Sequence, residues 1–243
     1  MGSAMVGLAL HGGALPIGGT FLVFLDYMRP PVRLAALSGA RCVFVFSHDS
    51  VAVGEDGPTH QPVEHLATLR AVPGLHVIRP ADANETAAAW ADAVAHDGPT
   101  VLVLSRQDVE VVTDGSAVCT GAATVVDRPM PQLVIVGTGA EVSLAVQAAE
   151  RLQEGGISAR VVSMPSWDRF RAQPAEAISE VLPAGVPVLS VEAASTFGWS
   201  EWADRSIGID SFGVSAPGGV ALEHLGISVD AVVAAARDMV GVS

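Results

Sequence analysis

Short hydrophobic runs alternate with helix-like segments along the chain, and this alternation constrains the fold more than any other feature. In the first half, buried strands are predicted at Cys42–Phe46, His76–Ile78 and Val101–Leu104. Each run is short and is followed by polar residues or turn residues. Strands that alternate with helices indicate α/β domains built on mainly parallel sheets flanked by helices.

Two helices are predicted between these strands. The apolar residues of 63–70 recur at helical spacing after Pro62, a residue type favoured in the first turn of a helix. Asp82, with Glu85 three residues later, resembles a capping box, which predicts a helix from there to about Ala95.

The second half repeats the alternation. Strands are predicted at Leu133–Val136, Ala159–Val162 and Val186–Val191, with an amphipathic helix over residues 142–152. Proline and glycine punctuate the sequence between the halves. We therefore expect two domains, 1–112 and 132–243, joined by a connector at 113–131.

The charge balance excludes several classes of function. The formal net charge is −13, which argues against nucleic acid or an anionic membrane as a partner. All 13 basic residues are arginine. Without lysine, the chain can form neither a Schiff base nor a Walker A phosphate loop.

The cysteines and the chain start bear on the cellular location. Cys42 and Cys119 lie far apart in the sequence, so we expect two small buried side chains without a disulfide. The first ten residues lack the basic segment of a signal peptide, and no run approaches the ~20 apolar residues of a membrane span. A soluble, cytoplasmic protein is predicted.

The most distinctive motif is the segment from His48 to Pro62, which follows the predicted strand ending at Phe46. Its first thirteen residues contain two histidines and three acidic residues, broken by Gly54, Gly57 and Pro58. Ligands of open α/β sheets usually bind where strands end. So many hydrogen-bonding groups in one loop suit a polyhydroxylated substrate.

Arg106 follows another predicted strand, in the sequence Leu104-Ser-Arg-Gln107. A guanidinium at the carboxyl end of a strand can bind a phosphate through two hydrogen bonds. Because the His48 loop is expected to end the neighbouring strand, an anion site is predicted between them.

Three aromatic residues, Phe21, Phe24 and Tyr27, recur at a helical spacing after Gly18-Gly-Thr20. Such a helical stripe packs into the core in most proteins. The same stripe would also stack on a planar heteroaromatic cofactor. Both interpretations remain open on spacing alone.

Two weaker motifs are assigned no ligand. Gly137-Thr-Gly139 lies between a predicted strand and helix, but Val142 occupies the position of the third glycine in a dinucleotide fingerprint. A tight strand-to-helix turn is predicted instead. His60, Glu64 and His65 are close in sequence without an HExxH pattern, so no metal site is predicted.

Six motifs, in order along nearly the whole chain, resemble transketolase. They are Pro16-Ile-Gly-Gly-Thr-Phe21 continuing to Tyr27, the His48–Pro62 loop, Ile78-Arg-Pro-Ala-Asp-Ala-Asn-Glu85, Leu104-Ser-Arg-Gln107, Val162-Ser-Met-Pro-Ser166 and Phe212-Gly-Val-Ser-Ala-Pro217. The resemblance implies the pyrimidine-binding and C-terminal domains of that family, which moves a two-carbon ketol unit between sugar phosphates in the pentose phosphate pathway.

The resemblance also implies roles for the motif residues. Phe21, Phe24 and Tyr27 would help to enclose the aminopyrimidine of thiamine diphosphate. His48 and Arg106 would bind the sugar phosphate. Asp56 and His60 would contact sugar hydroxyls, with His60 assisting proton transfer.

The sequence departs from the family in what it lacks. From the resemblance, we expect this chain to lack the domain that holds the diphosphate and its Mg²⁺, and the activating glutamate of the family would lie directly before Met1. We therefore expect a transketolase-like fragment that is inactive alone. Three alternatives remain. The chain could be a subunit of a split enzyme that needs an N-terminal partner, or a non-catalytic sugar-phosphate-binding or interaction protein. It could also be a longer gene read from an internal methionine, or a truncated copy. Because the family binds its cofactor between subunits of a dimer, an exposed apolar interface is expected around Gly2–Leu10 and Phe21–Tyr27.

Overall fold

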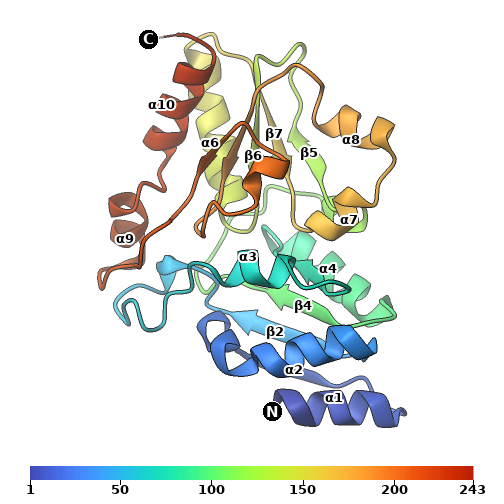
Figure 1. Cartoon of the computed structure of the whole chain (residues 1–243). Helices are drawn as coiled ribbons and strands as arrows, with labels where there is room; N and C mark the ends of the chain where they lie inside the picture. Colours follow the sequence, from blue (N-terminus) through green and yellow to red (C-terminus); the bar gives the residue numbers. More distant parts are fainter. Residues whose placement is uncertain (243) are drawn as a thin grey trace.

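The computed structural model describes residues 1–242 as two α/β units, one above the other in Figure 1. The first unit contains α1 (Gly2–His11), β1 (Ile17–Phe21), η1 (Leu22–Phe24), α2 (Leu25–Ser38), β2 (Val43–Ser47), η2 (Val51–Val53), α3 (His65–Arg70), β3 (His76–Ile78), α4 (Ala83–Ala95) and β4 (Thr100–Val103). The second contains α5 (Ala117–Thr120), β5 (Ala123–Val126), β6 (Leu133–Gly137), α6 (Glu141–Glu154), β7 (Ala159–Ser163), α7 (Trp167–Arg171), α8 (Ala175–Val181), β8 (Val188–Val191), η3 (Trp199–Glu201), β9 (Arg205–Ile207), α9 (Gly218–His224) and α10 (Val229–Met239).

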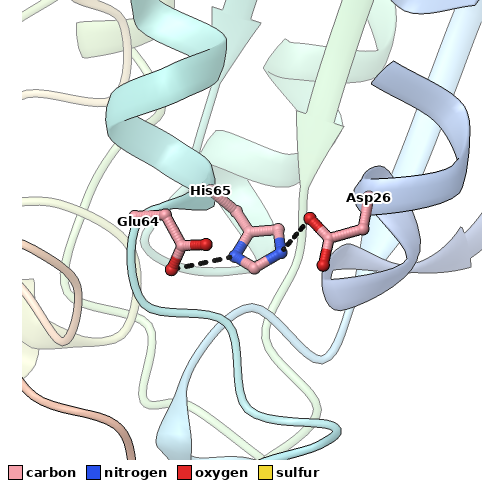
Figure 2. Close-up of side chains that lie close together, drawn as sticks. All are labelled: Asp26, Glu64 and His65. Carbon is pink, nitrogen blue, oxygen red and sulfur yellow. Dashed lines mark ion pairs between the residues drawn. The ribbon is translucent and has the colours of Figure 1, made fainter. Parts of the chain in front are cut away.

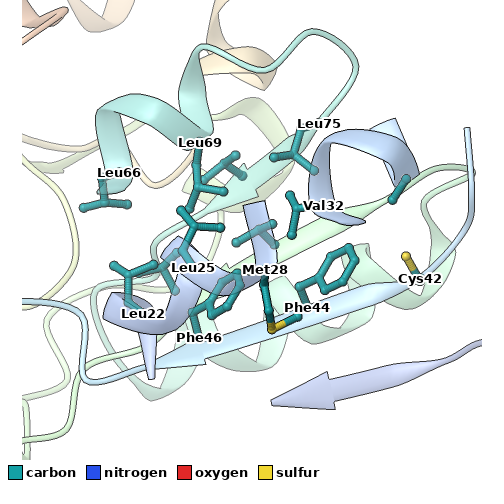
Figure 3. Close-up of a cluster of buried hydrophobic side chains, with 14 of the residues drawn as sticks. Leu22, Leu25, Met28, Val32, Cys42, Phe44, Phe46, Leu66, Leu69 and Leu75 are labelled. Carbon is teal, nitrogen blue, oxygen red and sulfur yellow. The ribbon is translucent and has the colours of Figure 1, made fainter. Parts of the chain in front are cut away.

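The first sheet is wholly parallel, with strand order β1-β2-β4-β3. Its two faces are both buried. Phe44 and Phe46 pack beneath α2 and α3 in a core that includes Leu25, Leu66 and Leu69 (Figure 3). The opposite face packs on α4. Burial on both faces explains why β2 reads as a continuous apolar run.

The second sheet has the order β5-β7-β6-β8-β9, in which β5 alone is antiparallel to its neighbour. Helices α6 and α10 pack on one face through the alanine-rich core around Ala145, Ala149 and Ala236. Trp167, Phe170 and Trp199 cover the other face. The prediction of two mainly parallel sheets flanked by helices is therefore confirmed.

Local signals match the observed elements closely. The Asp82 carboxylate accepts hydrogen bonds from the backbone N–H groups of Asn84 and Glu85 and so caps α4. The Glu85 carboxylate accepts from the Ala81 N–H at 2.7 Å, which completes a close variant of the predicted capping box.

The segment between the halves contains structure of its own. β5 pairs with β7 of the second sheet, while α5 packs against α4 of the first unit. The limits 1–112, 113–131 and 132–243 remain predictions about the domain boundaries. Short strands on an edge are hard to recognise because half-buried residues give little hydrophobic pattern.

Two surface expectations have clear outcomes. Cys42 is buried as expected, but Cys119 is exposed, so the prediction of two buried cysteines is wrong for Cys119. Apolar side chains are exposed in the expected N-terminal region, where Leu8, Leu10 and Tyr27 are 54%, 57% and 82% accessible.

The stretch Gly218–Met239 has the length and hydropathy of a membrane span, although no such span was expected. The chain turns between α9 and α10, however, and Gly226 in that turn has a positive φ of 84°. α10 packs along α6 with Val232 and Ala236 in the core. These are packed helices of the second unit.

Candidate functional site

The carboxyl ends of β1, β2 and β4 lie side by side at one edge of the first sheet. Phe21 ends β1 and is paired in register with Ser47, the last residue of β2. His48 follows β2 directly, and Arg106 follows β4 by three residues. The sheet order therefore brings three predicted site residues to one edge.

His48 has an unusual backbone. Its φ is +60°, a left-handed conformation that few non-glycine residues adopt. The imidazole stacks on the Phe21 ring with 3.6 Å between centroids and 22° between planes. Its Nδ1 pairs with the Ser47 hydroxyl at 3.0 Å. No hydrogen bond within residues 1–242 uses its Nε2.

Electrostatics link His48 to two other predicted residues. Desolvation lowers the pKa of His48 below its usual 6.5, and Arg106 lowers this pKa further, while Asp56 and Asp49 oppose the shift. Arg106 and Asp56 are both exposed, and neither forms an ion pair within the described residues. We call His48, Asp56, His60 and Arg106 the rim.

His60 lies beside the aromatic residues. Its ring meets Phe24 edge-on, with 5.8 Å between centroids. Phe24 stacks on Phe21 with 5.9 Å between ring centroids, and its ring centroid lies 6.2 Å from that of Tyr27. The three aromatics come from β1, η1 and α2, so the expectation of one helical stripe is wrong. A strand end and a 3₁₀ turn at the same spacing produce the cluster instead.

The loop that carries Asp56 and His60 is held by the second unit. The Gln61 side-chain amide donates to the carbonyls of Val51 and Gly54 at 3.1 and 2.9 Å, and to that of Val214 at 2.9 Å. The Ser215 hydroxyl donates to the Glu55 carbonyl at 2.6 Å.

Glycine allows these two segments to approach backbone to backbone. A Cβ added to Gly218 would lie 2.5 Å from the Ala52 carbonyl oxygen, a contact that real side chains do not make. A Cβ on the next residue, Gly219, would meet nothing within 4 Å. The close approach at Gly218 fixes α9 against η2.

Behind the rim lies a buried charge cluster that joins the two units. Arg79, 1% accessible, donates to the Asp49 carboxylate at 2.9 Å and to the Glu141 carboxylate at 2.6 Å. Its Nη1 also lies 3.5 Å from a Glu192 oxygen. We call Asp49, Arg79, Glu141 and Glu192 the seam.

A second arginine, Arg70, adds positive charge beside the seam. Arg70 forms two hydrogen bonds of 2.8 Å with Glu192, and its guanidinium lies 4.1 Å above the Trp167 ring. Burial raises the pKa of Glu192, but Arg70 and Arg79 outweigh this effect and hold the pKa at about 2. Burial raises the pKa of Glu141, while the neighbouring Arg79 lowers it in part.

The Gly137–Gly139 segment forms the predicted strand-to-helix turn and also receives Arg79. The Thr138 carbonyl accepts from Arg79 at 3.1 Å, and the Gly139 N–H donates to the Arg79 carbonyl at 3.2 Å. A Cβ on Gly139 would lie 2.6 Å from the Arg79 Nε. The Gly137–Gly139 turn therefore binds the side chain of Arg79 from the first unit.

Sequence reasoning did not identify the seam as a group. Asp49, Arg79 and Glu192 each follow a buried strand, which is the one signal that was available. Arg79 and its partner Glu192 lie 113 positions apart in the sequence, so spacing alone could not pair them.

Together the fold and the strand-end edge define a class: a two-unit α/β protein whose first unit presents aromatic, imidazole and guanidinium groups at one sheet edge. The comparisons with known proteins specify the family. Residues 1–111 match the family "Transketolase, pyrimidine binding domain", and residues 121–228 match "Transketolase-like TK C-terminal domain". The chain belongs to the transketolase family.

Individual transketolases are also similar to this chain in sequence and in structure. The chain is 49% identical to "Transketolase" of Geobacillus stearothermophilus over 99% of its own length and 38% of that protein. The solved "Transketolase from Leishmania mexicana" superposes with a TM-score of 0.95 at 51% identity, over 98% of this chain and 36% of that one. The chain thus spans a little over a third of the length of such relatives.

The chain covers a larger share of one other solved relative. The solved "Split gene transketolase, inactive beta4 tetramer" superposes with a TM-score of 0.84 at 25% identity. The match covers 98% of this chain and 80% of that chain.

Proposed function

We propose that this chain supplies the sugar-phosphate and pyrimidine side of a transketolase active site. One observation carries the proposal. Arg106 and the Nε2 of His48 lie at adjoining strand ends without a partner in residues 1–242, while nearly every buried charge behind them is paired. Unpaired, exposed groups at the carboxyl edge of a parallel sheet are placed to bind a ligand.

Each rim residue has a role that follows from its chemistry. The planar Arg106 guanidinium would bind phosphate oxygens through two hydrogen bonds, with His48 Nε2 as a further donor. The exposed Asp56 carboxylate would accept hydrogen bonds from sugar hydroxyls. His60, near the Phe24 edge, would donate to a hydroxyl close to the reacting carbons and assist proton transfer there.

The aromatic cluster fits the pyrimidine part of thiamine diphosphate. The Phe21 and Phe24 rings lie 11° from parallel, and Tyr27 is 82% accessible. A planar heteroaromatic ring would stack on this surface. The cofactor supplies the carbon–carbon bond chemistry when bound, and these residues orient its ring.

We further propose that the chain functions with a partner that contributes the diphosphate and Mg²⁺ site. The split-gene relative, whose chain this one covers to 80%, favours that arrangement. The exposed apolar residues Leu8, Leu10 and Tyr27 offer a surface for such a partner or for a second copy. The proposed location is the cytoplasm, where sugar phosphates are found.

The test uses the 243-residue chain alone and mixed with the separately produced N-terminal part of the Geobacillus enzyme. Ketol transfer from xylulose 5-phosphate to ribose 5-phosphate should be undetectable for the chain alone and should appear in the mixture. Turnover by the chain alone would contradict the need for a partner. Binding of ribose 5-phosphate with no activity in any mixture would favour the non-catalytic sugar-phosphate-binding alternative.

A further inference from the structure

A third group of titratable side chains lies where α2 meets α3, outside the rim and the seam (Figure 2). His65 Nε2 lies 3.2 Å from an Asp26 oxygen, and its Nδ1 lies 3.9 Å from a Glu64 oxygen. One ligand atom of each residue lies within 4.8 Å of the other two. His60, grouped with Glu64 in the sequence, takes no part in this cluster.

The imidazole of His65 is buried without a hydrogen bond. Its side chain is 6% accessible, and neither ring nitrogen has a hydrogen-bond partner within residues 1–242. The nearby Asp26 oxygen lies off the hydrogen-bonding direction of Nε2. Each ring nitrogen lies at ion-pair distance from one carboxylate, but a buried polar group normally also has an aligned partner, and a metal ion on the ring would supply it.

The carboxylates add a second requirement. A carboxylate oxygen of Asp26 and one of Glu64 lie within 4.8 Å of each other, although both side chains are more than half exposed. Two negative charges at this distance repel each other, and a cation bound beside His65 would offset that repulsion. Their exposure also provides a route for an ion from solvent.

We propose that Asp26, Glu64 and His65 bind a divalent cation of the zinc type. Ligands at 2.0–2.2 Å from a tetrahedral Zn²⁺ lie about 3.4 Å apart, close to the 3.2 Å between Asp26 and Nε2. One ring nitrogen coordinates the ion, and Glu64 turns toward it through its exposed side chain. Water fills the fourth position.

The donor set selects the kind of metal. An imidazole nitrogen with two carboxylates suits Zn²⁺, whereas Mg²⁺ and Ca²⁺ prefer oxygen ligands alone. The ion would join α2 (Leu25–Ser38) to the six-residue α3 (His65–Arg70), one position from Tyr27. Because the site uses none of the rim residues, this proposal does not depend on the proposed function.

The experiment titrates Zn²⁺ into the full chain by calorimetry, with Cys119→Ser as the parent because Cys119 is an exposed thiol that also attracts zinc. The parent should bind one Zn²⁺ and melt at a higher temperature with it, an effect that EDTA reverses. Asp26→Asn and His65→Gln should each lower the affinity at least about tenfold. Asp97→Asn and His11→Gln, which change exposed residues elsewhere, should leave it unchanged.

Two results would overturn the proposal. The first is the absence of stoichiometric Zn²⁺ binding by the parent chain. The second is an affinity in Asp26→Asn equal to that of Asp97→Asn. Since Asp26 is exposed, its variant remains informative even if replacing the buried His65 prevents folding.

Discussion

The seam and the rim both contain arginine and carboxylate side chains, but these side chains differ in burial and in ion pairing. In the seam, Arg79 is enclosed by carboxylates of both units, and all four residues are at most 3% accessible. In the rim, Arg106 and Asp56 are exposed without an ion pair in the described part of the chain. Paired charges hold the units together, while unpaired charges remain available to a ligand.

The two regions are joined at consecutive residues. His48 belongs to the rim and Asp49 to the seam, so Arg79 anchors the residue next to the left-handed His48. Since Glu141 and Glu192 hold Arg79, the second unit supports the backbone from which His48 projects. The C-terminal unit thus positions the rim without contributing one of its four residues.

The largest effect should come from breaking the seam. Arg79→Met leaves Asp49 and Glu141 as buried carboxylates without their partner, which should cost about 3–5 kcal/mol of unfolding free energy. Arg171→Met is the matched control, because Arg171 makes two hydrogen bonds of 2.6 Å to Glu201 on the surface. That exposed pair should contribute about 1 kcal/mol or less in urea denaturation. Equal losses of unfolding free energy in Arg79→Met and Arg171→Met would contradict the prediction that buried ion pairs contribute more than exposed ones.

A smaller effect should follow from separating the rim loop from the second unit. Gly218→Ala places a methyl group 2.5 Å from the Ala52 carbonyl, so it should destabilise the chain by about 1–3 kcal/mol and weaken ribose 5-phosphate binding. Gly219→Ala introduces the same methyl group into open space and should change neither quantity appreciably. Calorimetry and thermal melting on the pair check this prediction. If Gly218→Ala and Gly219→Ala had the same stability and the same ribose 5-phosphate affinity, the conformation of the rim loop would not depend on α9.

Much of the fold could be predicted from sequence, since β2, β4 and the capped α4 are specified by local pattern. Asp82 and Glu85 lie three residues apart, and their capping contacts form within one turn. The seam could not be predicted, because Arg79 meets Glu141 only after the two sheets pack. The regular spacing of Phe21, Phe24 and Tyr27 indicated an aromatic cluster, although these residues lie in three different elements.

Removing a rim charge should affect binding and leave stability unchanged. Arg106→Gln should weaken ribose 5-phosphate binding at least about tenfold through the loss of a charge-assisted hydrogen bond. Its unfolding free energy should stay within about 0.5 kcal/mol of the parent, because Arg106 has no partner to lose. Arg33→Gln, an exposed change of equal charge on α2, is the binding control. A large loss of stability in Arg106→Gln would show that Arg106 belongs to the structure rather than to a site.

The smallest effect concerns pH. Because desolvation and Arg106 lower the pKa of His48, its imidazole is neutral near pH 7 and gains a proton as the pH falls below 6.5. A cationic imidazole attracts phosphate, so lowering the pH below 6.5 should favour ribose 5-phosphate binding by the parent relative to His48→Gln, a comparison that cancels the titration of the phosphate itself. Arg106→Gln should raise the His48 pKa, which an NMR titration of the ring protons measures directly. An unchanged or lower His48 pKa in this variant would show that Arg106 does not lower it in the parent.

The most direct test is to map ribose 5-phosphate on the full chain by amide chemical-shift perturbation. The account predicts saturable shifts at His48, at the Asp56–His60 segment and around Arg106, with Arg70 and Glu141 unaffected. Shifts confined to other surfaces, or none at millimolar ligand, would contradict the claim that the unpaired rim is the ligand site.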